Sequence, residues 1–175
     1  MKIVVLKGSP RTSGNSNWLA DRFVDEAVRA GHECFVFDCA KQQINGCLGC
    51  GACGMKRPCV QQDDFVRLRE PLIEADAILF ATPIYYFGMS GQLKNVIDRF
   101  YAVHGCMGRK KTLLFATMGN PDARVADPAV AMYEKMVDYL GWEDCGRIIA
   151  AGVWAPGDVQ QGAFGEQAAA LARSL

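Results

Sequence analysis

The stretch KIVVLK at residues 2–7, followed directly by GSPRTSGNS at residues 8–16, decides the fold of this 175-residue chain. Its first six residues are mostly β-branched and aliphatic without alternating polar positions, which is typical of a strand that helices cover on both faces. A polar loop follows, and from Leu19 to Ala27 apolar residues recur at helical spacing until Gly31. The chain is therefore predicted to begin with a central strand, a polar loop and a helix.

The alternation of strands and helices continues to the end of the chain. Further strands are expected at His32–Asp38, Ala75–Ala81, Thr112–Met118 and Arg147–Val153, and helices at Asp63–Glu74, Ser90–Val103, Asp127–Leu140 and Ala163–Ala172. This order predicts an α/β fold with a doubly wound parallel sheet. We expect a single domain over residues 1–175, with one cysteine-rich insertion at residues 42–62.

The composition excludes several classes of function. Half of the residues are hydrophobic, so the chain can bury a sizeable core. Nineteen basic and nineteen acidic residues leave no net charge, and so no field that would attract nucleic acid or an anionic membrane. No apolar stretch is long enough for a membrane span, and the N-terminus enters a strand without a signal peptide. We therefore expect a cytoplasmic protein whose partners are small molecules or proteins.

The polar loop at residues 8–16 is suited to binding phosphate. In parallel sheets of this kind, ligands bind beyond the carboxyl ends of the strands, and this loop follows the first strand. It offers serine, threonine, asparagine and arginine side chains together with the N–H groups of a starting helix, and all of these donate to a phosphate monoester. The alternative is that Asn15 or Ser16 only caps the helix.

Two further loops are expected at the same edge of the sheet. The stretch TPIYYFGMSG at residues 82–91 follows the third strand, and its Tyr85, Tyr86 and Phe87 could stack on a planar ring. The alternative is that these aromatics belong to the core or to an interface. The stretch TMGNP at residues 117–121 follows the fourth strand, where free backbone groups could meet the edge of the ring.

These motifs, GSPRTSGNSNWL, TPIYYFGMSGQLKNVIDRF and the third loop, resemble the NAD(P)H-dependent FMN reductase branch of the flavodoxin-like proteins. The resemblance covers nearly the whole chain. It implies a flavodoxin-like three-layer sandwich with five parallel strands in the order 2-1-3-4-5. It also implies FMN as cofactor, NAD(P)H as cosubstrate, a small-molecule electron acceptor, and assembly as a homodimer or homotetramer.

The resemblance also assigns roles to individual residues. The FMN phosphate would be held by Ser9, Arg11, Thr12, Asn15 and Ser16. The ring and ribityl chain would be lined by Pro83, Ile84, Tyr85, Tyr86, Phe87 and Gly88, and the far ring edge by Thr117, Met118, Gly119 and Asn120. Tyr86, Phe87 and Met89 would face a second subunit. No side chain is expected to act as a catalytic acid or base, because the flavin carries the chemistry.

Four of the eight cysteines form a compact motif within the insertion. Cys47, Cys50, Cys53 and Cys59 are spaced C-x2-C-x2-C-x5-C, and the intervening glycines allow the backbone to curl around a [4Fe–4S] cluster. Zinc and free or redox-paired thiols remain alternatives. The segment resembles the cysteine motif of iron-sulfur flavoproteins, which implies single-electron exchange with a ferredoxin-type donor.

Three kinds of residue are expected to have no such role. Gly49, Gly51 and Gly54 match G-x-G-x-x-G, but no hydrophobic strand precedes them, so they are not a dinucleotide-binding motif. The four other cysteines are expected to be buried and inert, and the three tryptophans to be packing residues. The sequence thus supports an NAD(P)H-dependent reductase of flavins, quinones or similar acceptors. An iron-sulfur flavoprotein and a non-catalytic flavin carrier or metal-binding module are the alternatives.

Overall fold

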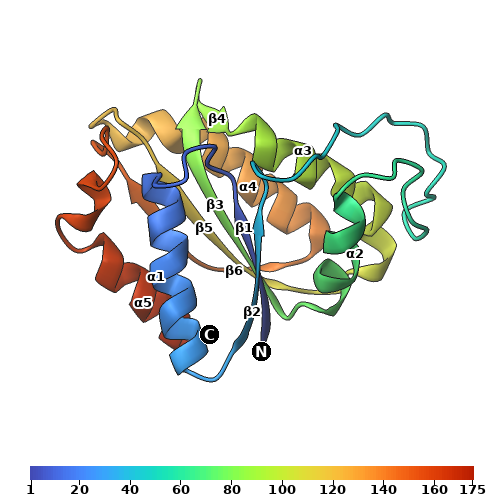
Figure 1. Ribbon diagram of the computed structural model, residues 1–175, viewed down its shortest axis with the longest axis horizontal. Helices are drawn as coiled ribbons and strands as arrows, with labels where there is room; N and C mark the ends of the chain where they lie inside the picture. Colours follow the sequence, from blue (N-terminus) through green and yellow to red (C-terminus); the bar gives the residue numbers. More distant parts are fainter.

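A computed structural model describes all residues from 1 to 175, and its central feature is a parallel sheet between two layers of helices (Figure 1). The five parallel strands lie in the order β2-β1-β3-β5-β6. Their bounds are β1 Lys2–Lys7, β2 Glu33–Asp38, β3 Ala77–Tyr85, β5 Lys111–Thr117 and β6 Glu143–Ala150. The helices are α1 Asn15–Arg29, α2 Phe65–Glu74, α3 Gly91–Arg99, α4 Asp127–Leu140 and α5 Phe164–Ser174.

The sheet confirms the predicted strand order and adds one element. A two-residue strand, β4 (Gly88–Met89), pairs antiparallel with the end of β3. This pairing lengthens β3 beyond its predicted end at Ala81. The last strand begins at Glu143 rather than at Arg147, because polar residues are tolerated at the exposed start of this edge strand, where the register shifts opposite Thr112 and Leu113.

Side chains from both faces of the sheet are buried, as the apolar runs predicted. Along β1, Ile3 and Val5 pack under α1 and α5, whereas Val4 and Leu6 pack under α2, α3 and α4. Figure 1 shows the first pair of helices on the left of the sheet and the other three on the right. This alternation with a period of two fixes the face that each strand residue occupies.

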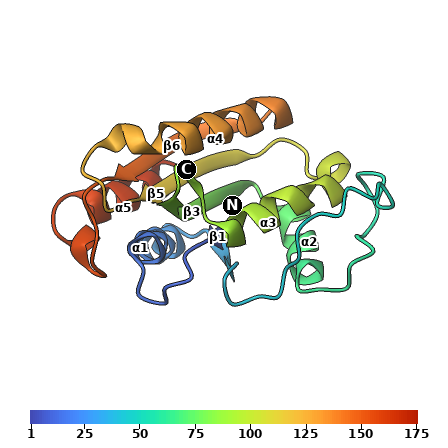
Figure 2. The same ribbon diagram turned by 90° about the horizontal axis from the view of Figure 1, so that it is seen from above.

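The segment between β2 and α2 carries the cysteine motif and lies along α2 and α3, away from α1 and α5 (Figure 2). Its two ends are joined at the start of α2. The Asp64 carboxylate accepts a hydrogen bond from Gln43 N at 2.8 Å, and the Asp63 carboxylate accepts one from Asn45 N at 3.0 Å. From α3, Asn95 donates to the carbonyl of Ile44. The segment is therefore a closed loop held against α3.

Arg99, the last residue of α3, is the main anchor of this loop. Its guanidinium contacts both carboxylate oxygens of Asp63, at 2.8 and 3.1 Å, and donates to the carbonyl of Asn45 at 3.0 Å. Arg99 is only 1% exposed, so its charge is satisfied by Asp63 and the carbonyl of Asn45 and not by water. Burial by itself would raise the pKa of the Asp63 carboxyl, but its hydrogen bonds with Arg99 and Asn45 hold that pKa below its ordinary value.

Replacing Arg99 with methionine is expected to destabilise the protein by about 3 to 5 kcal/mol at neutral pH, because the carboxylate of Asp63 is left buried without its partner. The pair stabilises the fold fully above the unfolded-chain pKa of about 3.9. Its contribution is lost as the pH falls through the lower folded-state value. The difference between wild type and Arg99→Met in urea denaturation should therefore shrink in acid. Arg67→Met, at an exposed position on α2, is the control, and an equal loss in both variants would contradict the assignment.

Candidate functional site

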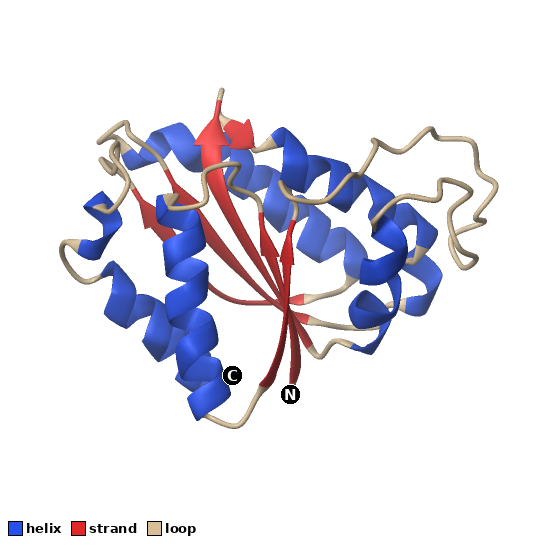
Figure 3. Cartoon of the chain, viewed as in Figure 1, coloured by secondary structure: helices blue, strands red, loops and turns tan.

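The register of the parallel strands brings several loops together at one edge of the sheet. Ala81 on β3 lies opposite Lys7, and Pro83 lies opposite Thr117, which in turn lies opposite Ala150. Figure 3 shows the strand arrows pointing toward the edge from which these loops leave. The loops enclose a cavity of about 230 Å³. It is lined by Ser9, Arg11, Gly14, Asn15, Ser16, Pro83, Ile84, Tyr85, Thr117, Met118, Gly119, Val153, Trp154 and Pro156.

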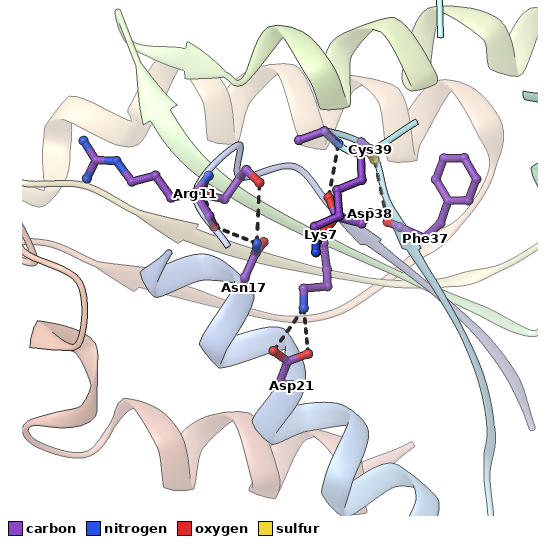
Figure 4. Close-up of polar contacts among 10 residues, drawn as sticks. Lys7, Arg11, Asn17, Asp21, Phe37, Asp38 and Cys39 are labelled. Carbon is purple, nitrogen blue, oxygen red and sulfur yellow. Dashed lines mark hydrogen bonds and ion pairs between the residues drawn. The ribbon is translucent and has the colours of Figure 1, made fainter. Parts of the chain in front are cut away.

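The first loop is held in place by hydrogen bonding with α1. The side-chain amide of Asn17 donates to the carbonyl of Arg11 at 3.1 Å, and Figure 4 shows the Arg11 guanidinium extending away from this contact. Arg11 N donates to Ser9 Oγ at 3.2 Å. Gly14 packs so closely that a Cβ there would lie 2.4 Å from Ser9 Oγ. These contacts hold the loop as a tight turn before the helix.

Several groups that suit an anion lie at this end of the cavity. Arg11 is the one charged residue among those that line the cavity, and it makes no ion pair. Ser16 is 1% exposed, and its Oγ has no hydrogen-bond partner. Helix α1 begins without a side-chain cap, so its first N–H groups are also free. A cation, an unpaired hydroxyl and a helix N-terminus together suit a phosphate.

Two residues predicted to bind phosphate have other surroundings. The side chain of Asn15 donates to the carbonyls of Val153 and Ala155, at 3.2 and 3.0 Å, and accepts from Gly157 N at 3.0 Å. Only its backbone N–H is left for a ligand. Thr12 lies outside the cavity and lines a neighbouring hollow. Ser9, Arg11 and Ser16 are the predicted side chains that the fold brings together.

The second loop is a tight hairpin between β3 and β4. Tyr85 pairs with Gly88, so Tyr86 and Phe87 are the two turn residues, and both have positive φ, 46° and 67°. This backbone conformation is unfavourable for residues other than glycine. Of the three aromatics only Tyr85 lines the cavity, whereas Tyr86 is fully exposed and Phe87 is 57% exposed. Met89 is buried in the core of its own chain, so it does not face a partner.

Ser90 connects the hairpin to the first loop. Its Oγ donates to the carbonyl of Gly8 at 2.6 Å and accepts from Leu93 N at 3.3 Å, which caps α3. Its own N–H donates to Thr82 Oγ1 at 3.0 Å. A Cβ at Gly8 would lie 2.8 Å from Ser90 Oγ, so glycine is required for this contact. The two loops therefore have a fixed relative position.

The third loop also lines the cavity. Thr117, Met118 and Gly119 line it, as predicted. Asn120 does not: its side chain accepts from Asp122 N at 2.9 Å, and its carbonyl accepts from Gly152 N. Gly88, at the start of β4, also lies outside the cavity.

A fourth segment, which the sequence analysis missed, completes the cavity. Val153, Trp154 and Pro156 follow β6 and line the same cavity as the three predicted loops. Trp154 was expected to be a core or interface packing residue, and its 79% exposure excludes the core. The signal in the sequence is the position of a tryptophan and a proline directly after the last strand, at the edge where ligands bind.

The four cysteines of the motif line a second, smaller cavity. Cys53 is buried, Cys59 is half-buried, and Cys47 and Cys50 are exposed, with Arg99 at the same cavity. No three metal-binding side chains are close enough to hold a metal ion. The cavity measures about 20 Å³, roughly the space of one water molecule. The four cysteines therefore share one cavity but are not assembled as a metal site in this structure.

The remaining cysteines are mostly unreactive. Burial raises the pKa of the Cys39, Cys34 and Cys145 thiols, which keeps them protonated. Only Cys39 is fully buried as expected, whereas Cys34, Cys106 and Cys145 are half-buried.

Comparison with known proteins finds a family model and several relatives that are similar to this chain. The family model described as NADPH-dependent FMN reductase matches residues 1–139. An iron-sulfur flavoprotein of Archaeoglobus fulgidus is 37% identical over 141 residues, covering 81% of this chain and 69% of that protein. YwqN of Bacillus subtilis, named as an NAD(P)H-dependent FMN-containing oxidoreductase, is 31% identical over 168 residues, covering 91% of this chain and 89% of YwqN.

The fold is also similar to solved structures. The structure of the Trp repressor binding protein from Bacillus subtilis is similar with a TM-score of 0.66 and 25% sequence identity, covering 99% of this chain and 97% of that one. Over several iron-sulfur flavoproteins, however, the chain spans only about half of their length. None of the helices has the combined length and apolar character that crossing a membrane requires.

Proposed function

The chain belongs to the NADPH-dependent FMN reductase family, and from that premise we propose that it is an FMN-dependent oxidoreductase. It would use NAD(P)H to reduce a flavin, a quinone or a similar small acceptor. The observation that carries this proposal is the cavity at the carboxyl edge of the sheet, which is cationic at one end and apolar at the other.

The residues present fit FMN at the phosphate end. The unpaired Ser16 Oγ is a buried hydroxyl that a phosphate oxygen would satisfy, and Arg11 supplies a free positive charge beside it. Ser9 and the first N–H groups of α1 complete the set. Gly14 leaves the room that the close approach of a phosphate needs, because a side chain there would collide with Ser9. We assign these groups to the FMN phosphate.

The other end of the cavity fits a planar ring. This end is lined by two neighbouring loops, which contribute Pro83, Ile84 and Tyr85 after β3 and Thr117, Met118 and Gly119 after β5. No carboxylate, imidazole or lysine lines this end, so the chain supplies no acid or base there. When bound, FMN supplies the hydride and electron transfer chemistry, and the walls orient the ring and exclude water from one side. A nicotinamide and then an acceptor would reach the ring from the open side of the cavity.

A second candidate function rests on the cysteine cavity. All four sulfurs of the C-x2-C-x2-C-x5-C motif line one cavity, and the donor set suits a [4Fe–4S] cluster. Three glycines of this loop have positive φ, namely Gly49, Gly51 and Gly54. Because glycine adopts many backbone conformations without steric cost, the loop can rearrange around a cluster. In this form the protein would be an iron-sulfur flavoprotein that accepts electrons from a ferredoxin-type donor. The buried cation of Arg99 would offset negative charge on the thiolates.

The proposal also covers the oligomeric state, the cellular location and the domain organisation of the protein. The exposed aromatic rings of Tyr86 and Phe87 suit contact with another copy of the chain in a homodimer or homotetramer. All eight cysteines are free, which suits the reducing conditions of the cytoplasm. We propose that residues 1–175 act as one domain, in which residues 42–62 are an insertion.

Replacing Arg11 or Ser16 with alanine should weaken the binding of FMN about tenfold or more, because each change removes a donor to a charged phosphate. Riboflavin lacks the phosphate, so its affinity should change little. Both affinities can be measured by titration of the protein freed of flavin. Arg67→Ala, at an exposed position on α2, is the control. If FMN and riboflavin lost affinity equally, the phosphate would lie elsewhere.

The reductase proposal is tested by anaerobic stopped-flow mixing of the FMN-loaded protein with NADPH and, separately, with NADH. We expect the visible absorption of the flavin to bleach with at least one nucleotide, because the mouth of the cavity leaves one side of the ring accessible. Absence of bleaching with both nucleotides, in protein that retains FMN, would favour a flavin carrier over a reductase.

Iron and sulfide analysis of anaerobically purified protein tests the cluster. About four iron and four sulfide ions per chain are expected, and Cys50→Ser should lose most of both because it removes a ligand. Cys145→Ser is the matched control, since Cys145 lies on β6 outside the motif. One zinc ion per chain, or no metal in any preparation, would contradict the cluster.

A further inference from the structure

The segment from Ala151 to Gly157 forms part of the cavity, yet it lies beyond the stretch that the family model matches, which ends at residue 139. The wall that it provides therefore lies outside the part of the chain that the family model describes. Its most exposed large side chain is Trp154, whose indole is 79% accessible although it borders the cavity. An aromatic ring in this position needs a physical reason, because exposing it is unfavourable.

Trp154 rests on the ring end of the cavity. A Cβ placed on Gly119 would lie 2.2 Å from Cε3 of Trp154 and 3.0 Å from its Cζ3, so the indole packs directly on the glycine backbone. Gly119 has no positive φ, so its lack of a side chain is required by Trp154 and not by its own backbone conformation. The loop after β5 and the loop after β6 therefore pack directly against each other at Gly119 and Trp154.

Asn15 holds the segment that carries Trp154. Its amide nitrogen donates to the carbonyls of Val153 and Ala155, the two residues that flank the tryptophan, and its amide oxygen accepts from Gly157 N. Asn15 is 9% exposed, so these contacts replace nearly all of its hydrogen bonds with water. The first residue of α1 therefore holds the backbone on both sides of Trp154.

We propose that Trp154 contacts the planar ring of the bound cofactor, and that Asn15 is a positioning residue that acts through Trp154. This inference rests on the proposed FMN site and adds a fourth wall to it. It changes the role of Asn15 from a phosphate ligand to the residue that orients the ring wall. Its side chain then affects the ring, while Ser16, the next residue, affects the phosphate.

The test compares the affinities of FMN and riboflavin for wild type and Trp154→Ala. Because Trp154 would contact the ring, both ligands should bind about tenfold more weakly to the variant, whereas Trp154→Phe should retain most of the affinity. The emission of the bound flavin should also rise in Trp154→Ala, since an indole in contact quenches it. Tyr139→Ala is the matched control, because Tyr139 is similarly exposed, at 74%, and lies on α4 outside the cavity.

Asn15→Ala and Gly119→Ala test the positioning. In each variant, the affinities for FMN and riboflavin should fall by the same factor. Asn15→Ala would release the segment that carries Trp154, and Gly119→Ala would displace its indole. In a double-mutant cycle, Asn15→Ala should have no further effect in the Trp154→Ala background. A purely structural role of Asn15 would instead weaken binding equally in both backgrounds, and that result would overturn the positioning role.

The outcomes separate this inference from the proposed function. If wild type and Trp154→Ala bound FMN equally well, the ring contact would be overturned and the proposed FMN site would stand. Wild type that binds neither FMN nor riboflavin would overturn both. If Asn15→Ala failed to fold, as judged by circular dichroism, Gly119→Ala and the exposed-site variant Trp154→Ala would still decide the ring contact.

Discussion

The hydrogen bond of 2.6 Å from Ser90 Oγ to the carbonyl of Gly8 links the two loops on which the site depends. Both groups are buried, so the bond cannot be exchanged for one with water. Ser90 also caps α3, and its Oγ lies so close to Gly8 that a side chain would not fit there. The first loop, the hairpin and the helix are therefore linked to one another. An anion site and a ring site built on separate loops require such a link, since otherwise the distance between them would vary with every loop motion.

Helix α3 connects this unit to the cysteine segment. Ser90 caps its first turn, and Arg99 at its last residue holds Asp63 and the carbonyl of Asn45. The nine residues of α3 therefore carry a neutral hydrogen-bonded anchor at one end and a buried ion pair at the other. The cavity at the sheet edge is pre-formed, whereas the cysteine cavity is closed and small. The two sites share a support but differ in how far the chain prepares them for a ligand.

Much of the fold could be predicted from the sequence because the runs in β1, β3 and β5 are apolar on both faces, which only a covered parallel strand requires. The gathering of Ser9, Arg11 and Ser16 at one cavity could be predicted because these residues are close together in the chain. The role of Asn15 could not, since its partners are carbonyls nearly 140 residues away, and an asparagine at a helix start has the same sequence signal whether it caps or reaches outward. The place of Trp154 at the cavity could not be predicted either, because its support at Gly119 comes from another loop.

The hairpin turn at Tyr86 and Phe87 places two bulky residues in left-handed backbone conformations, where asparagine and glycine would be comfortable. Each such residue costs on the order of 1–3 kcal/mol of local stability. Neither side chain recovers this cost inside its own chain, since both rings are exposed. The rim of the cavity next to Tyr85 is therefore a locally strained turn, and the fully exposed ring of Tyr86 makes no contact that offsets this strain.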